Sequence, residues 1–368
     1  MLAIESLSSI TGRGASRVGR KLLWASLLLA PITLLLRYAL HAGDTTLFVA
    51  SAAALVPLAW LIGEATEHAG EHTGPVIGGF LNASFGNAPE LIIALFAVNA
   101  SLPNVVRGSL AGSVVSNILL VLGVALVFGG DVQGGRPLER SSLLLQLGLV
   151  MIAVLLFLVP AVPGWSGNPE RHSLAVATIP VAVGLLLLYM AVTAHSLRVA
   201  KRQHAESGAT AIGSWPLRTA LLALAAATVL TALISETLVH SLHAFAEAAG
   251  LSEFFIAVVI VAIVGNAAEH GGAVVIAMRG KLRLATEIAV SSSAQVALFV
   301  TPAVALLAWV VRPPLPLSFR PIELATMGGA AALVSVTLAD GRGRRWEGYL
   351  LVAVYVGVAL AFLAAGDR

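Results

Sequence analysis

The chain has 368 residues, of which 58% are hydrophobic and 11% charged, with a formal net charge of +3 and a mean hydropathy of +0.92. A soluble domain carries about 25% charged residues, so this composition excludes an ordinary soluble protein and indicates a polytopic membrane protein. The positive charge does not indicate nucleic acid as a partner, because basic residues in a membrane chain mostly report topology.

A helix needs about 20 apolar residues to cross the hydrocarbon core of a bilayer. Eleven candidate spans follow in chain order, at 22–40, 46–66, 75–99, 105–128, 141–160, 173–196, 215–239, 254–278, 285–311, 321–339 and 346–364. They lack the alternation in segments of about 10 residues that is typical of a membrane β-barrel. The predicted fold class is therefore an all-α, multi-pass membrane protein with about 11 transmembrane helices.

Basic residues are distributed unevenly between the predicted loops. Arg13, Arg17, Arg20 and Lys21 precede the first span, and most of the 22 Lys and Arg residues fall on the same side as they do. Cytoplasmic loops are the basic ones, so we expect a cytoplasmic N-terminus. No small-residue cleavage site follows the first apolar run, so we expect that helix to be retained. Compact size without an organelle-type extension favours a bacterial plasma (inner) membrane.

Two short stretches nearly repeat each other, GNAPE at 86–90 and GNAAE at 265–269. A glutamate lies upstream of each, Glu64 in the second span and Glu236 in the seventh. A polar helix face lies downstream of each, made by Ser113, Ser116 and Asn117 in the fourth span and by Ser292, Ser293 and Gln295 in the ninth. Without the first span, each copy has five spans. Because five is odd, the copies insert with opposite orientation, as inverted repeats do.

This internal repeat predicts that the chain is divided into four parts. Residues 1–45 form an N-terminal segment with the first helix, and 46–198 form the first five-helix repeat. Residues 199–214 form a basic cytoplasmic linker, and 215–368 form the second five-helix repeat.

The two motifs carry the residues of a candidate site. Asn87 and Glu90, like Asn266 and Glu269, are three residues apart and so project from one helix face. Pro89 lacks an N–H and would release a backbone carbonyl. Carboxylate, amide and carbonyl oxygens suit a hard cation such as Ca²⁺, and the chain has no cysteine to offer a softer metal.

The charge of the site predicts coupling. No Lys or Arg lies deep in a predicted span, so Glu64, Glu90, Glu236 and Glu269 cannot all be paired internally and must be protonated, hold a cation or face water. Two carboxylates are neutral with one Ca²⁺ or with two protons, and crossing while empty is costly. His270 follows Glu269 and is a candidate for proton coupling, with a packed polar histidine as the alternative.

Three segments carry a family resemblance: GGFLNASFGNAPELIIALFAV, VVRGSLAGSVVSNILLVLG and VGNAAEHGGAVVIAMRGKLRLATEIAVSSSAQVALFVTP. They resemble the paired alpha-repeats of the calcium/proton exchanger (CAX) family, within the cation/calcium antiporter superfamily. The resemblance covers most of residues 46–364. It implies a secondary active transporter that exchanges Ca²⁺ for H⁺ by alternating access. No cofactor is implied, since Ca²⁺ and H⁺ are the transported substrates.

The resemblance also implies roles for residues. Glu90 and Glu269 would be the main cation and proton carriers, and Asn87 and Asn266 would help to line the site. The accessory lining or pathway residues would be Ser116, Asn117, Ser293 and Gln295, with Glu64 and Glu236 nearer the span ends. The repeats would form two related five-helix bundles, with the first span sliding along one side.

Two features depart from the family. Relatives carry an acidic helix between the repeats, whereas this linker is basic, with Arg198, Lys201 and Arg202. Regulation through an acidic helix is therefore not expected. Pro89 stands where relatives often have Thr, which would change the local helix break.

Three functions remain open at this point. The first is Ca²⁺/H⁺ antiport, and the second is antiport of Ca²⁺ for Na⁺, or of another divalent cation such as Mn²⁺ or Mg²⁺. The third is an intramembrane metallopeptidase, because His68, Glu71 and His72 fit an HxxEH pattern. Gly70 and the following Gly74-Pro75 weaken that helix, which favours a solvated rim. The sequence leaves open whether the chain forms a homo-oligomer.

Overall fold

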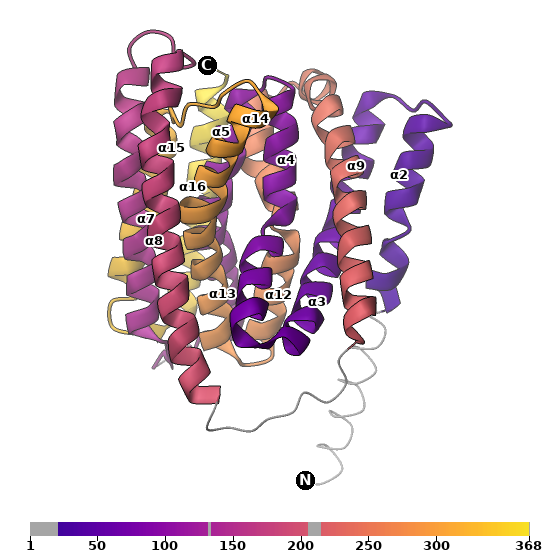
Figure 1. The fold of residues 1–368 in the computed structure, drawn as a ribbon. Coiled ribbons are helices and arrows are strands. Elements are labelled where there is room, and N and C mark those ends of the chain that lie inside the picture. The colour runs from indigo at the N-terminus through magenta and orange to yellow at the C-terminus, as the bar shows by residue number, and fades with distance from the viewer. Residues whose placement is uncertain (1–20, 132–133, 205–214, 368) are drawn as a thin grey trace.

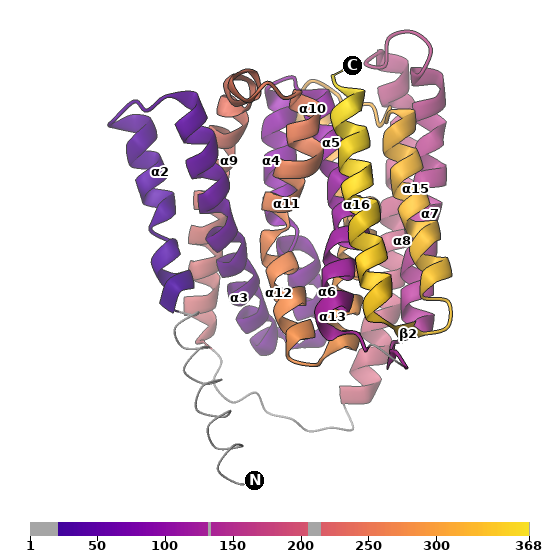
Figure 2. The ribbon, with the colours of Figure 1, turned by 180° about the vertical axis from the view of Figure 1, so that it is seen from behind.

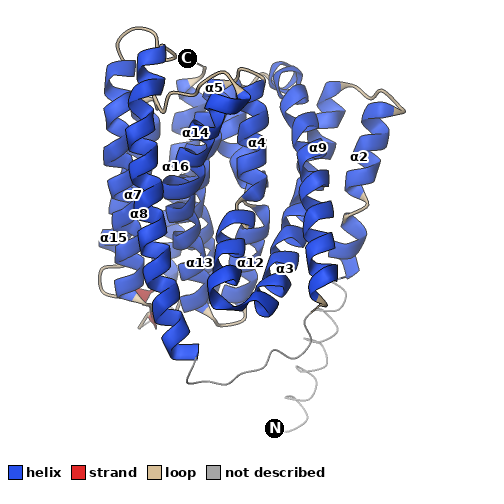
Figure 3. Ribbon diagram, in the orientation of Figure 1, coloured by secondary structure: helices blue, strands red, loops and turns tan. Residues whose placement is uncertain are grey.

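The computed structural model describes residues 21–131, 134–204 and 215–367, which form a bundle of long helices (Figure 1). The predicted basic residues Arg13, Arg17 and Arg20, and residues 205–214 of the predicted linker, lie outside the described residues. Within the described part, the strands are two short segments, β1 (Arg136–Pro137) and β2 (Arg342–Gly343), which pair antiparallel (Figure 3). The predicted all-α class is confirmed.

The helices of the first half are α2 (Leu29–Tyr38), α3 (Asp44–Phe85), α4 (Ala88–Asn99), α5 (Pro103–Val115), the π-helix η1 (Ser116–Val121), α6 (Leu122–Gly129), α7 (Arg140–Ala161), the 3₁₀ turn η2 (Val162–Gly164) and α8 (His172–His204). Those of the second half are α9 (Leu217–Ala249), α10 (Glu253–Phe255), the π-helix η3 (Ile256–Val261), α11 (Ala262–Gly265), α12 (Ala267–Met278), α13 (Leu282–Gln295), the π-helix η4 (Val296–Val300), α14 (Thr301–Val311), α15 (Pro321–Thr337) and α16 (Arg345–Ala365).

Eight helices in the described residues are long and apolar enough to cross a membrane. A ninth span results if Glu253–Gly265 and Ala267–Met278, bent by 59°, are counted together. The expected spans at 75–99 and 321–339 correspond to shorter apolar helices, α4 and α15. The count of 11 is therefore not confirmed, because two of the expected spans contain helices too short to pass by length alone.

The chain reverses direction within the residues of α3. The backbones of Gly70 and Gly78 are in contact, since a Cβ on Gly78 would lie 2.8 Å from the Gly70 Cα. Eight residues of straight α-helix would separate them by about 12 Å. The first arm of α3 therefore runs toward one end of the bundle, and the chain then returns toward α4 (Figure 1). Only glycines allow the two backbones to approach so closely.

The two repeats have opposite orientation. In Figures 1 and 2, α4 leads to α5 at one end of the bundle, whereas α12 leads to α13 at the other. Both π-helices η1 and η4 follow a polar helix face, α5 in the first repeat and α13 in the second. The predicted inverted repeats are confirmed by this arrangement.

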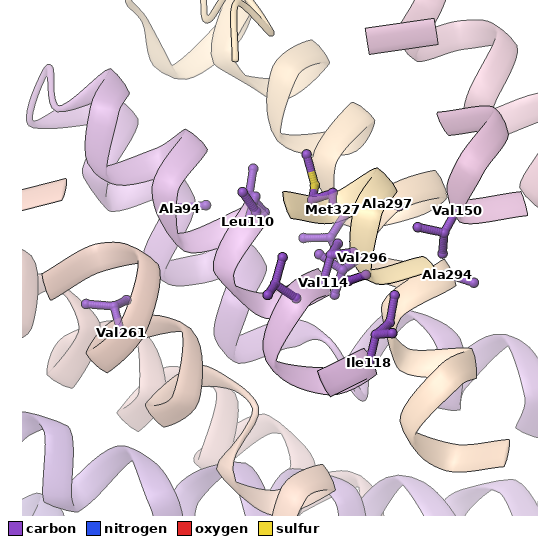
Figure 4. Packing of buried hydrophobic residues seen from close by; sticks show 14 of the residues in the cluster. Ala94, Leu110, Val114, Ile118, Val150, Val261, Ala294, Val296, Ala297 and Met327 are labelled. Atoms are coloured by element: carbon purple, nitrogen blue, oxygen red, sulfur yellow. The ribbon is translucent and has the colours of Figure 1, made fainter. Parts of the chain in front are cut away.

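The core lies where the central helices of the two repeats meet. Val114 and Ile118 of the first repeat lie beside Val296 and Ala297 of the second (Figure 4), and all four are almost completely buried. The helices approach most closely at Gly112, where a Cβ would lie 1.9 Å from the Val258 carbonyl oxygen. This packing brings the polar faces of α5 and α13 toward the two motifs.

One end of the bundle gathers basic loops, and we call it the basic end. The β1–β2 pair joins the loop before α7 to the loop before α16, and Arg136 donates a hydrogen bond to the Gly280 carbonyl at 3.0 Å. The start of α9 lies at the same end (Figure 1). At the opposite end, buried Arg107 donates to Glu170 at 2.7 Å and to the Pro316 carbonyl at 3.2 Å, which ties α5 to two loops.

Candidate cation site

Each GNAxE motif interrupts its helix at the asparagine. In the first motif α3 ends at Phe85, Asn87 has φ −97° and ψ 15°, and α4 begins at Ala88 with Pro89 in its first turn. In the second, α11 ends at Gly265, Asn266 has φ −92° and ψ 9°, and α12 begins at Ala267. A helix break is present in both repeats with nearly the same backbone conformation, as Pro89 led us to expect for the first motif.

The breaks place both glutamates at helix N-termini. Glu90 lies in the first turn of α4 and Glu269 in the first turn of α12. The free N–H groups and the dipole at a helix start favour negative charge. Each break therefore partly offsets the cost of holding a carboxylate inside the membrane.

The two carboxylates lie together and are incompletely satisfied. Glu90 is 7% exposed, whereas Glu269 is only partly buried. Their charges repel each other. Ser292 lies beside Glu269, whose Oε2, like the Oε2 of Glu90, is buried without a hydrogen-bond partner among the described residues. Such atoms are rare in folded proteins and mark the pair as a candidate site.

Glycine in one motif makes room for the glutamate of the other. A Cβ on Gly265 would lie 3.3 Å from Glu90 Cγ, so the Glu90 side chain packs directly against the second motif. A narrow cavity beside them is lined by Glu90, Ser109 and Ser113 together with apolar residues. The two motifs thus form one site at the interface of the repeats.

Amide side chains link the repeats in two pairs. Asn87 of the first motif donates to Gln295 Oε1 of α13 at 2.7 Å. Asn117 of η1 donates to Asn266 Oδ1 of the second motif at 3.2 Å. In each pair the asparagine of one motif meets the amide that follows the polar face of the other repeat. Four of the predicted site residues are therefore brought together.

His270 joins this network through Asn117. Its Nε2 lies 2.9 Å from Asn117 Oδ1. Because the Asn117 amide group donates to Asn266 and, at 2.9 Å, to Ser292, its oxygen accepts from the histidine in this arrangement. The contact with His270 therefore completes the hydrogen bonds of the Asn117 amide.

The structure distinguishes between the predicted serines. Ser116 donates to the carbonyl of Ser113 in its own helix at 3.2 Å, and Ser293 donates across to the Val114 carbonyl at 3.1 Å. Ser113 instead accepts from Asn266 at 2.8 Å, and Ser292 contacts both Asn117 and Glu269. Ser113 and Ser292 belong to the polar faces predicted from the sequence, but neither was among the predicted lining residues.

The upstream glutamates have their own partners. Glu236 pairs with Arg37 of α2, with an Nη2–Oε1 distance of 3.3 Å, and Arg37 also donates to Thr237 at 2.7 Å. Glu64 lies 3.8 Å from His68 Nε2.

The HxxEH residues lie at the basic end of α3. His68 Nδ1 is 3.4 Å from Glu71, and the His68 ring stacks on Trp215 at 4.8 Å. His72 Nε2 is 2.6 Å from the Trp215 carbonyl. The two histidines therefore contact the start of α9 rather than a shared point. In the part of the chain that the structure describes, no three His, Asp or Glu side chains are grouped to hold a metal ion.

The donors around the site are consequently oxygens from mixed groups. A cation between Glu90 and Glu269 would take carboxylate oxygens and complete its shell from amides, hydroxyls and backbone carbonyls, which is the chemistry that Ca²⁺ prefers. Two facing carboxylates also accept protons in place of a cation.

Comparison with known proteins agrees with this geometry. The sodium/calcium exchanger protein family matches residues 44–198 and 219–364. The Ca²⁺/H⁺ antiporter ChaA of Bacillus subtilis is 37% identical over 330 residues, covering 88% of this chain and 93% of its own length. A Ca²⁺/H⁺ antiporter of Aphanothece halophytica is 34% identical over 356 residues, covering 91% and 94%.

The solved structure of native YfkE superposes with a TM-score of 0.79 at 34% identity, covering 93% of this chain and 99% of the other. The named antiporters among these proteins are transporters and not enzymes. The resemblance expected from the two motifs is confirmed, and the chain belongs to the sodium/calcium exchanger protein family.

Proposed function

We propose that this integral membrane protein exchanges Ca²⁺ for H⁺ by alternating access at the site formed by Glu90 and Glu269. The observation that carries the proposal is the pair of close carboxylates at two symmetric helix breaks, each with one buried oxygen that lacks a partner among the described residues. The relatives named as Ca²⁺/H⁺ antiporters cover most of the chain and support the same substrates.

The charge of the site couples the transport of Ca²⁺ to that of H⁺. The empty site holds two repelling negative charges, and neither carboxylate has an ion pair with a basic side chain among the described residues. One Ca²⁺ or two protons neutralise it. Reorientation of the empty site would move uncompensated charge through low-dielectric surroundings, which costs several kcal/mol per ion. Exchange is therefore favoured over one-way flux.

The residues take the following roles in this proposal. Glu90, Glu269, Asn87 and Asn266 hold Ca²⁺, and the glutamates with His270 take part in proton coupling. Ser116, Asn117, Ser293 and Gln295 support the lining, and Glu64 and Glu236 lie along the pathway. The two five-helix repeats at 46–198 and 215–368 form the moving halves, with 1–45 and the basic linker 199–214 outside them.

We further propose that the basic end faces the cytoplasm, since basic loops are retained there. In a bacterial plasma membrane the proton gradient would then drive Ca²⁺ out of the cell. Relatives named as Ca²⁺/H⁺ antiporters in the bacteria Bacillus subtilis and Synechocystis support this location.

The test is Ca²⁺ uptake into proteoliposomes that are acidic inside, with the wild type, Glu90→Gln and Glu269→Gln. We expect either substitution, and a protonophore, to lower the rate of Ca²⁺ uptake at least about 100-fold. Removing a group that only supports a metal ligand already costs about 10–100-fold. Glu139→Gln, which changes an exposed carboxylate paired with Arg283, is the matched control and should transport normally.

The same vesicles separate the alternatives. Uptake that survives the protonophore and both substitutions would contradict the proposal. Uptake driven by an outward Na⁺ gradient at constant pH would identify Na⁺/Ca²⁺ exchange, and competition by Mn²⁺ or Mg²⁺ would measure selectivity. The metallopeptidase interpretation of HxxEH is set aside, because the relatives are transporters.

A further inference from the structure

The HxxEH residues have no role in the exchange as described so far. Glu64, His68 and Glu71 are spaced i, i+4 and i+7, so they lie in one row along a single face of α3. The row begins inside the bundle and ends at the basic end. Side-chain exposure is 22% for Glu64, 16% for His68 and 32% for Glu71.

The imidazole of His68 lies between two carboxylates. Its Nε2 is 3.8 Å from Glu64 Oε1, and its Nδ1 is 3.4 Å from Glu71 Oε2. Both ring nitrogens therefore face an acceptor. An imidazole placed in this way can receive a proton on one nitrogen and release one from the other.

Trp215, just before α9, stacks on the His68 ring, and Trp24 lies 5.9 Å from Trp215. Other charged or titratable groups on α3 and on the elements packed against it include Asp44, Glu67 and His72 of α3, Arg37 of α2, Glu90 of α4, Arg218, Glu236 and His240 of α9, and Glu269 and His270 of α12. None of these forms an ion pair with His68 among the described residues.

Glu64 lies on the part of α3 that packs near the first helix break. Its neighbours Leu61, Ile62 and Ala65 form one apolar cluster with Ala88, the residue that follows Asn87. The row of three side chains thus runs from the basic end toward the first helix break.

We propose that Glu71, His68 and Glu64 form a proton relay between the aqueous phase at the basic end and the cation site, a proposal that rests on the proposed exchange. In the release direction, Glu64 gives a proton to Nε2 of His68, and Nδ1 gives its own proton to Glu71 and then to water. The ring returns to its first tautomer by rotation, so no proton is gained or lost. The 3.8 Å gap exceeds hydrogen-bond distance, so this transfer requires a side-chain rotation that closes it.

The chain offers a matched control at the corresponding position of the other repeat. Glu236 and His240 of α9 have the same i, i+4 spacing as Glu64 and His68. His240 is exposed and Glu236 is paired with Arg37, so His240 is not placed to pass protons between carboxylates.

The experiment measures the initial rate of Ca²⁺ uptake into inside-out membrane vesicles as the external pH is varied, for the wild type, His68→Phe, His68→Asn and His240→Phe. Phenylalanine keeps the stacking on Trp215 but carries no proton, whereas asparagine removes both properties. We expect both His68 variants to lower the maximal rate by about 10-fold or more, since a positioned acid–base group contributes at least that much. Their apparent Ca²⁺ affinity should stay within about twofold, and added imidazole should restore part of the rate.

Three results would overturn the relay. Normal rates in both His68 variants would remove any role, and a normal rate in His68→Phe with a slow His68→Asn would leave only stacking. A slow His240→Phe would show an unspecific effect of losing a histidine. A wild type without gradient-driven uptake would overturn the exchange and the relay together, whereas a normal wild type with normal His68→Phe would overturn the relay alone. If the His68 variants do not fold, Glu71→Gln at the solvent end of the row is the second test, and the relay predicts a slow rate of uptake for it.

Discussion

The two helix breaks share a motif and a backbone conformation but differ in their surroundings. Glu90 is almost completely buried against Gly265, and Leu91 follows it. Glu269 is partly exposed, contacts Ser292, and is followed by His270, which holds Asn117. The repeated sequence therefore produces two half-sites with different neighbours.

The largest difference is expected when each glutamate is shortened. Glu90→Asp should weaken apparent Ca²⁺ affinity about 10-fold more than Glu269→Asp, because the Glu90 side chain is fixed by packing against Gly265, whereas Glu269 is less completely enclosed. Calcium titration of uptake in proteoliposomes measures both. Equal losses would mean that the two half-sites are equivalent despite their burial.

A smaller effect is expected from the residue that breaks the symmetry. His270→Leu, which copies Leu91, removes a hydrogen bond worth about 1 kcal/mol, so Ca²⁺ affinity should fall about fivefold. His270→Gln keeps a donor for Asn117 and should restore affinity, but the proton-driven rate should remain low. If His270→Gln restores both the Ca²⁺ affinity and the proton-driven rate, His270 has no part in proton coupling and only orients Asn117.

A further test alters the contact between the motifs. Gly265→Ala places a methyl group 3.3 Å from Glu90 Cγ, so the carboxylate must shift by a few tenths of an ångström. We expect about a threefold loss of affinity, below the 10–100-fold that loss of a supporting contact costs, because the ligand is displaced and not removed. Gly271→Ala, where no atom lies within 4 Å, is the control and should be unchanged. The same loss in both variants would point to helix propensity instead of the contact.

The smallest effect on transport is expected from the ion pair of the upstream glutamate Glu236. Arg37→Gln removes the ion pair with Glu236, whose side chain is 44% exposed. Exposed pairs contribute about 0–1 kcal/mol, so thermal stability and transport should change little. A large loss of transport with normal stability would show that Arg37 has a role in the movement of α2.

Much of the site could be predicted from sequence because its signals are local. The breaks at Asn87 and Asn266 follow from glycine and proline chemistry, and the buried glutamates are visible against apolar surroundings. The pairs Asn87–Gln295 and Asn117–Asn266 could not be predicted, since they depend on the relative rotation of helices from different repeats.

The same limit applies to the fold. Hydropathy located the helices. The contact of Gly70 with Gly78 and the short lengths of α4 and α15 depend on tertiary packing, about which a sliding hydropathy window carries no information. The pairing of Arg37 with Glu236 could likewise not be predicted, because the two residues lie 199 positions apart in the chain.

The π-helical turn η1 has a consequence for the evolution and engineering of this chain. It separates the polar face of α5 from α6, where a Cβ on Gly123 would lie 3.1 Å from the Gly348 carbonyl oxygen of α16. A π turn holds one more residue than an α turn, and one residue rotates a helix by about 100°. Deleting a single residue from η1 would therefore turn the α6 surface away from α16 while leaving Ser113 in place. Length changes in this lineage should accumulate in the loops and in the linker, and η1 should keep its number of residues.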